Sequence, residues 1–423
     1  MELSNKIFFE VKGDKYAFLR DNMEILMLPQ NIKEEDIEQF LIFPVHPQNV
    51  EKKHCFSAKN ISNVSVNLVN GCNLNCKYCY IGAYQRENNK LSESDFKKII
   101  NFFIKQGITN LDFYFSGGGE PLINFELLKN IPSISNEMGI KKLAVEINTN
   151  GTLITQEIAD FFKENNFLVN VSIDGPKEVH NITRKYHTGK GSFDDVMRGL
   201  NILKQYKVNF ACKTVLLPNS KNIIEIFDFF ENNQLPLVFD IATPSTTGHY
   251  KPLLEDIDNF SNYFSTVIDK YIHKIKNNQK IFSLKIFNDL RKIHKRTWRN
   301  KGCKACYNSI YIEMNGDIYP CLYHAGKDVV SMGNIYTGID FKTIIEKERY
   351  AKNIDEYPAC KECWLKYICG GGCFAIKWIV NGNTTEPHQY LCKYLDMYWK
   401  NIIRLYIETY KFITDEKNIN NIN

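Results

Sequence analysis

The sequence has no apolar run long enough to cross a bilayer and no segment that resembles a signal peptide. It also carries little excess charge: 53 basic and 48 acidic residues leave a net charge of +5, which does not indicate a nucleic-acid-binding protein. We therefore expect a cytoplasmic protein with no membrane and no nucleic acid as partner. With 423 residues and 44% hydrophobic content, the chain can build two or three domains with hydrophobic cores.

The thirteen cysteines are not expected to form disulfides, because a cytoplasm keeps thiols reduced. Their distribution indicates metal binding instead. Cys55 and Cys212 stand alone, three cysteines fall between residues 72 and 79, and eight fall between residues 303 and 392. The sequence therefore predicts two metal-binding regions.

The first region is a loop in which Cys72, Cys76 and Cys79 have C-x3-C-x2-C spacing, directly after a β-type run over residues 61–69. A structural zinc site would have a fourth Cys or His nearby, and a closed [4Fe-4S] cluster would have a fourth Cys. The loop has neither, so a cubane bound here would keep one iron open for another ligand. We interpret the loop as a catalytic cluster site, with a degenerate zinc knuckle as the alternative.

Strand and helix patterns alternate from residue 61 to about residue 280. The expected strands span residues 64–69, 111–115, 143–147, 168–173, 209–216 and 237–241, and the expected helices span residues 93–105, 125–138, 156–165, 193–206 and 223–232. Buried strands that alternate with helices form a parallel sheet covered by helices. The predicted fold class is therefore α/β, a partial (β/α)6 barrel of the TIM type, whose ligands bind at the carboxyl ends of the strands.

Residues suited to ligand binding follow the strands of this barrel. Gly118, Gly119 and Glu120 come after the second strand. Glycine lets a backbone approach a ligand closely, and a carboxylate can hold an ammonium group. Because this turn comes one β/α repeat after the cysteine loop, we interpret it as part of the same site.

The next two strands end in polar side chains. Asn150 follows the third strand, and Ser172 and Asp174 follow the fourth; these short side chains suit sugar hydroxyls or a carboxylate. The alternative for Asn150 and Asp174 is that they only cap turns. Arg184 follows twelve residues after Ser172, and its guanidinium can clamp a carboxylate with two hydrogen bonds.

The second metal-binding region is the late cysteine field. Eight thiolates suit two closed [4Fe-4S] clusters, although zinc fits C-x2-C pairs almost as well in isolation. The catalytic loop upstream and the segment Gly316-Asp317-Ile318-Tyr319-Pro320-Cys321 favour iron and sulfur. The eight cysteines are Cys303, Cys306, Cys321, Cys360, Cys363, Cys369, Cys373 and Cys392.

These motifs together resemble those of the radical S-adenosylmethionine (SAM) enzymes that carry a SPASM extension. The resemblance covers residues 61–395 and implies three [4Fe-4S] clusters, one that binds SAM and two auxiliary ones. It also implies that Tyr78 lies against the adenine and that the Gly118-Gly119-Glu120 turn grips the amino group of SAM. The remaining implied contacts to SAM are Asn150, Ser172, Asp174 and Arg184.

The resemblance also implies how the auxiliary clusters are ligated. The first cluster would take Cys303, Cys306, Cys321 and Cys373. The second would take Cys360, Cys363, Cys369 and Cys392. Some family members leave one iron of the first auxiliary cluster open for substrate, so here either this cluster is closed or one of Cys303 and Cys306 is displaced on binding.

The same resemblance implies a maturase that generates a 5′-deoxyadenosyl radical and modifies a ribosomally made precursor peptide. We favour an intramolecular thioether between a Cys sulfur and a carbon, with a carbon–carbon or carbon–oxygen crosslink as alternatives. The expected partners are a precursor peptide with a leader sequence and a small electron donor such as flavodoxin or ferredoxin. A non-catalytic metal-binding peptide scaffold is a distant alternative.

Anaerobic sulfatase maturases, which form formylglycine, are the other alternative. They carry an Asp directly after the cysteine that corresponds to Cys321, where it is thought to act as the base. This chain has Leu322 at that position, and Leu cannot accept a proton. We therefore assign no general base, although Tyr323, His324 or an acid from elsewhere could substitute.

We expect five consecutive regions. Residues 1–60 form a small N-terminal segment with a hairpin of strands at 6–11 and 15–19 and a helical segment at 32–40. This segment is either a short, winged-helix-like element that binds a leader peptide or a cap on the barrel. Residues 61–280 form the barrel, 281–300 a basic linker, 301–395 the SPASM domain, and 396–423 a C-terminal helix and tail.

Overall fold

The computed structural model describes residues 6–30, 61–79, 82, 87–243, 252–303, 305, 308–339 and 353–413. The chain divides into two compact units. The barrel unit comprises His54–Pro252 and Lys304–Ala351, and the second unit comprises Met1–Lys53, Leu253–Cys303 and Lys352–Asn423. Each unit combines segments that are far apart in sequence, whereas the predicted domains are consecutive stretches. The predicted domain boundaries stay a prediction.

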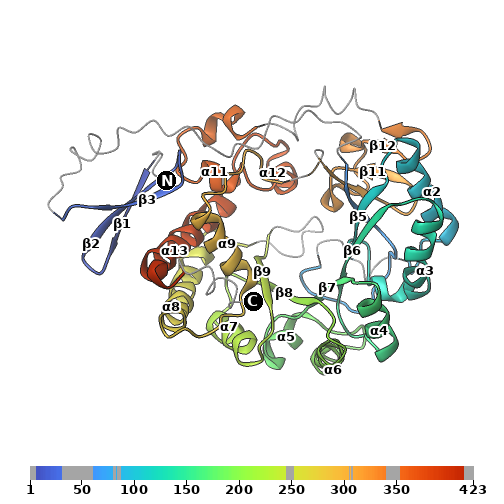
Figure 1. The fold of residues 1–423 in the computed structure, drawn as a ribbon, viewed down its shortest axis with the longest axis horizontal. Coiled ribbons are helices and arrows are strands. Elements are labelled where there is room, and N and C mark those ends of the chain that lie inside the picture. Colours follow the sequence, from blue (N-terminus) through green and yellow to red (C-terminus); the bar gives the residue numbers. More distant parts are fainter. Residues whose placement is uncertain are drawn as a thin grey trace. The chain divides into compact units, whose positions relative to one another are not determined.

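The barrel unit is built on a sheet of parallel strands. These are β4 (Asn63–Val66), β5 (Asn110–Phe115), β6 (Lys142–Thr149), β7 (Leu168–Ser172), β8 (Phe210–Leu216) and β9 (Leu237–Ile241), and they are adjacent in this order. The intervening helices are α2 (Glu93–Lys105), α3 (Phe125–Glu137), α4 (Gln156–Glu164), α5 (Lys177–Thr183), α6 (Phe193–Gln205) and α7 (Ile223–Asn232). The sheet curves with its helices on the outer side (Figure 1), which confirms the predicted α/β partial barrel.

The sheet continues beyond its first barrel strand in a way that was not predicted. β10 (Ser309–Ile312) pairs in parallel with β4, and the antiparallel strands β11 (Asp317–Tyr319), β12 (Gly333–Asn334) and β13 (Gly338–Ile339) follow. Short 3-10 helices at Pro121–Asn124 (η4), Leu322–His324 (η5) and Asp328–Val330 (η6) complete this unit. Part of the predicted SPASM region therefore extends the barrel sheet.

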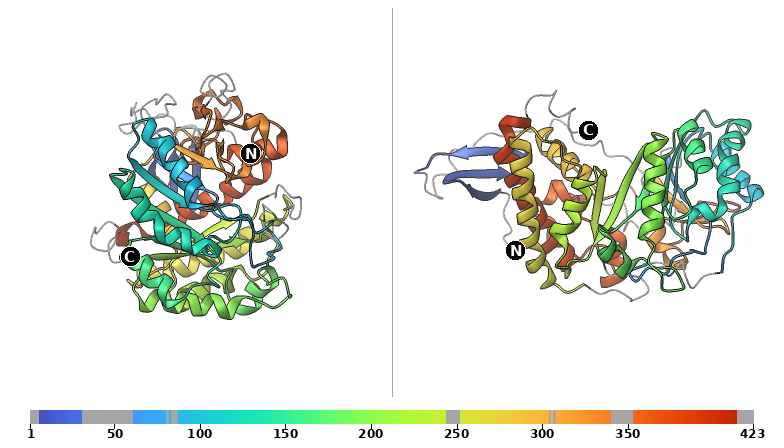
Figure 2. Two further views of the ribbon diagram at one scale, coloured as in Figure 1. Left: turned by 90° about the vertical axis from the view of Figure 1, so that its right-hand side faces the viewer. Right: turned by 90° about the horizontal axis from the view of Figure 1, so that it is seen from below.

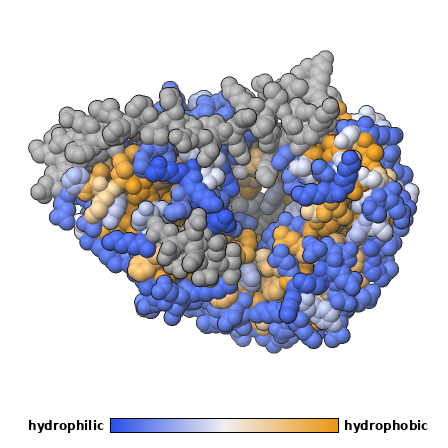
Figure 3. Space-filling view, in the orientation of Figure 1, coloured by the Kyte–Doolittle hydropathy of each residue, from blue (hydrophilic) through white to orange (hydrophobic). Residues whose placement is uncertain are grey.

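Helix caps and aromatic packing fix these elements. The Ser92 hydroxyl accepts a bond from the Asp95 amide at the start of α2, and Thr155 caps α4 in the same way. Under α2, the ring of Phe96 lies 5.4 Å from that of Phe113. Figure 2 shows α2 and α3 in front of the strands in its left view, and hydrophilic side chains predominate on the outer helices in Figure 3.

The second unit contains a small sheet and a group of helices. The predicted hairpin is present as β1 (Lys6–Val11) and β2 (Asp14–Leu19), and a third strand that was not predicted, β3 (Glu24–Leu28), pairs with β2. The predicted helical segment at 32–40 lies outside the described residues. The helices are α8 (Asp256–Lys276), α9 (Leu284–His294), α11 (Lys366–Cys369), α12 (Phe374–Asn381) and α13 (Gln389–Ile413), with 3-10 turns at Ile354–Glu356 (η7) and Pro358–Cys360 (η8).

The long helix α13 packs against α8 and α9. The ring of Tyr394 lies 6.0 Å from that of Phe260, and the ring of Tyr398 lies 5.5 Å from that of Phe264. α9 falls inside the predicted basic linker and buries Asp289, which accepts a bond from the Tyr398 hydroxyl at 2.8 Å. Across the described residues, no helix combines the length and apolarity that a membrane span requires.

Candidate active site

A cavity of about 400 Å³ opens at the carboxyl ends of the strands in the barrel unit. It gathers side chains from the cysteine loop and from the ends of β5 to β9, as expected for a parallel sheet. Nine predicted site residues line it: Cys72, Cys76, Tyr78, Cys79, Gly119, Glu120, Asn150, Ser172 and Arg184. The predicted residues Gly118 and Asp174 do not line it; they lie in the layer that supports this wall.

The glycine turn is held directly against the cysteine loop. A Cβ atom on Gly119 would lie 1.7 Å from the carbonyl oxygen of Gly71, and one on Gly118 would lie 1.9 Å from the side chain of Asn67. The Glu120 amide donates to the same Gly71 carbonyl at 3.0 Å. These glycines are therefore needed for contact within the chain, in addition to the predicted approach to a ligand.

Glu120 is a buried carboxylate at the edge of the cavity. It accepts bonds from the Thr149 hydroxyl at 2.6 Å, from the Asn150 amide at 2.7 Å and from the Leu122 amide at 3.1 Å. Burial raises the pKa of Glu120 to about 7, although these bonds oppose the rise. A cationic group of a ligand would favour its ionised form, which fits the predicted contact with an ammonium.

Arg184 is held by a buried carboxylate behind the cavity wall. Asp174 Oδ2 accepts from Arg184 Nε at 2.9 Å, from Thr183 Oγ1 at 2.8 Å and from the Tyr78 hydroxyl. The guanidinium also lies over the Tyr78 ring, 5.3 Å from its centre. Burial is the largest single influence and would lower the pKa of Arg184, but Asp174, Tyr78 and Cys76 together outweigh it and raise the pKa, so the guanidinium that lines the cavity stays charged.

Asp174 thus positions two residues that line the cavity. Burial is the largest single influence and would raise its pKa, but Arg184, His180 and Tyr78 together outweigh burial and keep the pKa below its usual value. Its second oxygen, Oδ1, is buried and has no hydrogen-bond donor among the described residues. That acceptor fits a donor on a bound cofactor, and the predicted direct contact of Asp174 stays a prediction.

The three thiols of the loop have the chemistry of a cluster site. Burial raises the pKa of Cys72 to about 12 and that of Cys76 to about 11, so their thiolates need a bound metal to be stable. In the part of the chain that the structure describes, no three His, Cys, Asp or Glu side chains are arranged to hold one metal ion. A cubane accepts its ligands on separate irons, so three thiols can hold one without surrounding a single ion.

The lining of the cavity also contains polar residues that the sequence analysis missed. Lys213 Nζ on β8 donates to the Tyr114 hydroxyl on β5 and to Asn148 Oδ1 on β6, both at 3.1 Å. It also lies 3.6 Å from the carboxylate of Glu146. Ser116 and Asp240 line the cavity too. A signal was present, because Lys213 and Asp240 each interrupt an apolar strand sequence.

The segment after Cys321 reaches the same cavity. Leu322 and Tyr323 line it, so an apolar side chain faces the cavity at the position that carries an Asp in sulfatase maturases. His324 is buried, and burial lowers its pKa to about 4. Of the two neighbouring residues named as substitutes for the missing base, only Tyr323 lines the cavity.

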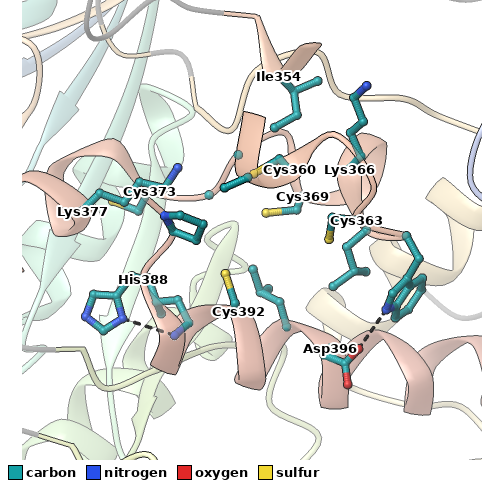
Figure 4. Close-up of a pocket in the computed structure, with 18 residues that line it drawn as sticks. Ile354, Cys360, Cys363, Lys366, Cys369, Cys373, Lys377, His388, Cys392 and Asp396 are labelled. Carbon is teal, nitrogen blue, oxygen red and sulfur yellow. Dashed lines mark hydrogen bonds between the residues drawn. The ribbon is translucent and has the colours of Figure 1, made fainter. Parts of the chain in front are cut away.

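The second unit holds a separate cage of thiols (Figure 4). Cys360, Cys363, Cys369 and Cys392 line one cavity of about 50 Å³, and their sulfur atoms point toward a common centre. Burial raises the pKa of Cys369 to about 12 and that of Cys392 to about 11, so these thiols also call for a metal. They are the four ligands predicted for the second auxiliary cluster.

The cage depends on the glycines of the segment Cys369-Gly-Gly-Gly-Cys373. All three adopt positive φ, between +64° and +93°, and a Cβ atom on Gly370 would meet the backbone of Lys301 at 2.6 Å. The chain can therefore reverse within three residues and bring Cys369 and Cys373 to the same cavity.

The four ligands predicted for the first auxiliary cluster do not lie together within either unit, as far as the described residues show. Cys373 lines the cage cavity, Cys303 is an exposed residue of the second unit, and Cys321 belongs to the barrel unit. Cys306 lies outside the described residues. The ligation of this cluster stays a prediction.

Comparisons with known proteins agree with this geometry. Residues 66–230 match the radical SAM superfamily, and residues 303–364 match the SPASM iron-sulfur cluster-binding domain. The chain is 27% identical over 366 residues to a serine-type anaerobic sulfatase-maturating enzyme of Bacteroides thetaiotaomicron, covering 78% of this chain and 86% of that protein.

Solved structures share the fold. The enzyme anSMEcpe with bound AdoMet superposes with a TM-score of 0.70 at 23% identity, covering 85% of this chain and 98% of that one. SuiB of Streptococcus suis bound to the precursor peptide SuiA gives 0.54 at 17% identity, covering 90% and 97%. The chain therefore belongs to the radical SAM superfamily and carries a SPASM domain, and it is an enzyme whose cofactors are SAM and [4Fe-4S] clusters.

Proposed function

We propose that this protein is a maturase that forms a thioether crosslink in a ribosomally made peptide. Cys72, Cys76 and Cys79 would hold the cluster that binds SAM, and Glu120 and Arg184 would bind its ammonium and carboxylate groups. When bound, SAM and its cluster supply a radical that removes one hydrogen atom from a carbon of the substrate. The chain's own residues bind, orient and shield the groups that react.

The polar wall formed by Tyr114, Asn148 and Lys213 is the part of the cavity that we assign to the substrate. Its residues are on β5, β6 and β8, where Lys213 donates hydrogen bonds to the other two, whereas the residues assigned to the cofactor are on the cysteine loop, in the turns after β5 and β6, and at and after the end of β7. The Lys213 ammonium suits a peptide carbonyl or carboxylate. The substrate carbon would then lie between this wall and the cofactor.

The position of Leu322 is the observation that favours a thioether over formylglycine as the product. Formylglycine formation needs a base close to the substrate carbon, and an apolar side chain lines the cavity at that position. A thioether forms with the loss of two hydrogens: one leaves as the atom taken by the radical, and the other as a proton and an electron. The cage of Cys360, Cys363, Cys369 and Cys392 would hold a cluster suited to accept this electron.

Sulfatase maturation is the second candidate, because Asp240 supports it. Its carboxylate is exposed and lines the same cavity at the end of β9, where it could act as the missing base. The similarity to sulfatase-maturating enzymes also favours this candidate. Substitution of Asp240 by Asn would abolish formylglycine formation and spare crosslinking.

The test is anaerobic reconstitution, reduction and incubation with SAM and two peptides. One is encoded by a small open reading frame beside the gene, with its leader sequence; the other is a sulfatase peptide with a target Cys or Ser. Mass spectrometry that finds two hydrogens lost and one thiol fewer available to a Cys-blocking reagent supports a thioether. The same loss with all thiols still reactive indicates a carbon–carbon or carbon–oxygen crosslink.

Four further outcomes are informative. An aldehyde on the sulfatase peptide, detected with a hydrazide probe, would assign the enzyme to sulfatase maturation. No cleavage of SAM would leave only a metal-binding scaffold. We also expect turnover with flavodoxin or ferredoxin as the electron donor, and a requirement for the leader sequence would separate a precursor peptide from a sulfatase.

A further inference from the structure

Lys377 is a buried cation for which the described residues offer no anionic partner. Its side chain is on α12 and is 3% exposed. The ammonium donates to the Thr384 carbonyl at 3.5 Å and lies over the rings of Tyr357 and Phe374, 4.8 Å and 5.7 Å from their centres. Within the ranges that the structure describes, no carboxylate lies within ion-pair distance of it.

Lys366 provides a contrast on the same cavity. It also lines the cage and is buried, but its ammonium lies 2.6 Å from the carboxylate of Asp355. A buried charge with no opposite charge costs several kcal/mol, which is why buried lysines are normally paired. The rings above Lys377 return only part of that cost, about 1 to 2 kcal/mol. The described part of the chain therefore provides no counter-charge for Lys377.

The cage of cysteines can supply the negative charge that would balance Lys377. α12 begins directly after Cys373, and the Lys377 amide donates to the Cys373 carbonyl at 3.2 Å, so the helix carries Lys377 to the cavity wall. Lys377 lines the cavity together with the four cage cysteines, as Figure 4 shows. Burial raises the pKa of Cys360 and Cys392, and the Lys377 charge opposes this rise at both thiols.

We infer that Lys377 is the internal counter-ion of the cluster held by the cage and that it raises the reduction potential of that cluster. This inference rests on the proposed cluster site of the second unit. Four thiolates make the cavity anionic, and each one-electron reduction adds one more negative charge. A fixed cation stabilises the reduced form more than the oxidised form, because potential follows net charge and burial.

The positive charge of Lys377 would favour the electron transfer that the proposed reaction requires. Crosslinking releases one electron in the substrate cavity, and a cluster of higher potential accepts it more readily. An arginine would keep the charge, whereas methionine has nearly the same length and removes it. Position 377 therefore sets how readily the cage accepts an electron, and it does so without contact with the substrate.

The test uses full-length protein in which Cys72, Cys76 and Cys79 are replaced by Ala, so that only auxiliary clusters form. Lys377→Met and Lys377→Arg are made in this background. The matched control is Lys393→Met: Lys393 follows Cys392 directly, but it is partly exposed and pairs with Asp258 at 2.7 Å. After anaerobic reconstitution, iron content is measured and the potential is read from a redox titration followed by electron paramagnetic resonance.

The paramagnetic resonance signal of the cluster in the cage is identified as the one that disappears when Cys360 and Cys392 are also replaced by Ala. We expect Lys377→Met to lower its potential by 59 mV or more, a tenfold change in the equilibrium constant for one electron. Lys377→Arg should keep the original potential, and Lys393→Met should shift it by less than half as much.

Equal potentials in Lys377→Met and Lys393→Met, with iron content intact, would overturn the role of Lys377 alone. A lower melting temperature of the cluster-free Lys377→Met protein, with no change in potential, would also overturn it, because the residue would then be structural. Unchanged iron content after loss of Cys360 and Cys392 would remove the cluster assignment itself, and the inference with it.

Discussion

Replacement of Asp174 by Asn tests whether its buried ion pair with Arg184 fixes the part of the cavity that we assign to SAM. Asp174 and Arg184 have side chains only 5% and 9% exposed, and the bond between them is 2.9 Å long. Asn has nearly the same shape but leaves the guanidinium without an opposite charge. Breaking a buried pair in this way costs about 3 to 5 kcal/mol, and we expect a loss of this size in the barrel unit.

The assay must report on the barrel unit. All four tryptophans, Trp298, Trp364, Trp378 and Trp399, belong to the second unit, so intrinsic tryptophan fluorescence is not suitable. Hydrogen exchange of peptides covering residues 177–192 reports on α5 and the segment that carries Arg184. A loss of about 3 kcal/mol speeds exchange through local opening on the order of a hundredfold.

The matched control for Asp174→Asn is Asp194→Asn. Asp194 pairs with Lys177 at 2.7 Å, but the two side chains are 68% and 51% exposed, so its loss should cost less than about 1 kcal/mol. Because Arg184 lowers the pKa of Asp174, the pair contributes stability above the usual pKa of aspartate and loses it as the pH falls through the lower, folded value. Exchange rates that match in the two variants would refute the reasoning.

Three further predictions concern the same cavity. Burial raises the pKa of Glu120 to about 7, so affinity for SAM, measured by equilibrium dialysis, should weaken as the pH falls below about 7, and Glu120→Gln should remove this dependence. Gly119→Ala forces a Cβ atom against the Gly71 carbonyl and should abolish iron binding at the loop. Gly107→Ala, which strains a backbone with φ of +77° but has open space around it, should retain the iron. Lys213→Met should raise KM for the peptide roughly tenfold, as expected for loss of a charged hydrogen bond, and leave SAM affinity unchanged; an unchanged KM would remove Lys213 from the substrate wall.

The barrel could be predicted because its signals are local. α2, α7 and β9 begin and end at the predicted residues, since apolar periodicity and capping residues such as Ser92 act within one turn or strand. The cysteine loop could be predicted for the same reason. Its three cysteines fall within eight residues, and their spacing alone restricts what they can bind.

The rest depends on contacts between residues far apart in sequence. Lys213, Tyr114 and Asn148 come from three strands, and only the parallel register brings them together. The pairing of β10 with β4 joins segments about 250 residues apart, and nothing in either strand specifies the other. A sequence shows that a polar residue interrupts a strand, but it does not show which other residues will face it.

Hydrogen bonds that involve no cysteine tie the cysteine loop to the rest of the barrel unit. The Asn75 amide donates to the Lys185 carbonyl at 2.7 Å and the Lys77 amide to the Thr183 carbonyl at 2.9 Å, which ties the loop to the segment of Arg184. On its other side, Asn150 Nδ2 donates to Asn73 Oδ1 at 2.8 Å. Because these bonds involve no cysteine, the loop can hold its shape before iron binds. We therefore expect cluster insertion to order little of this loop.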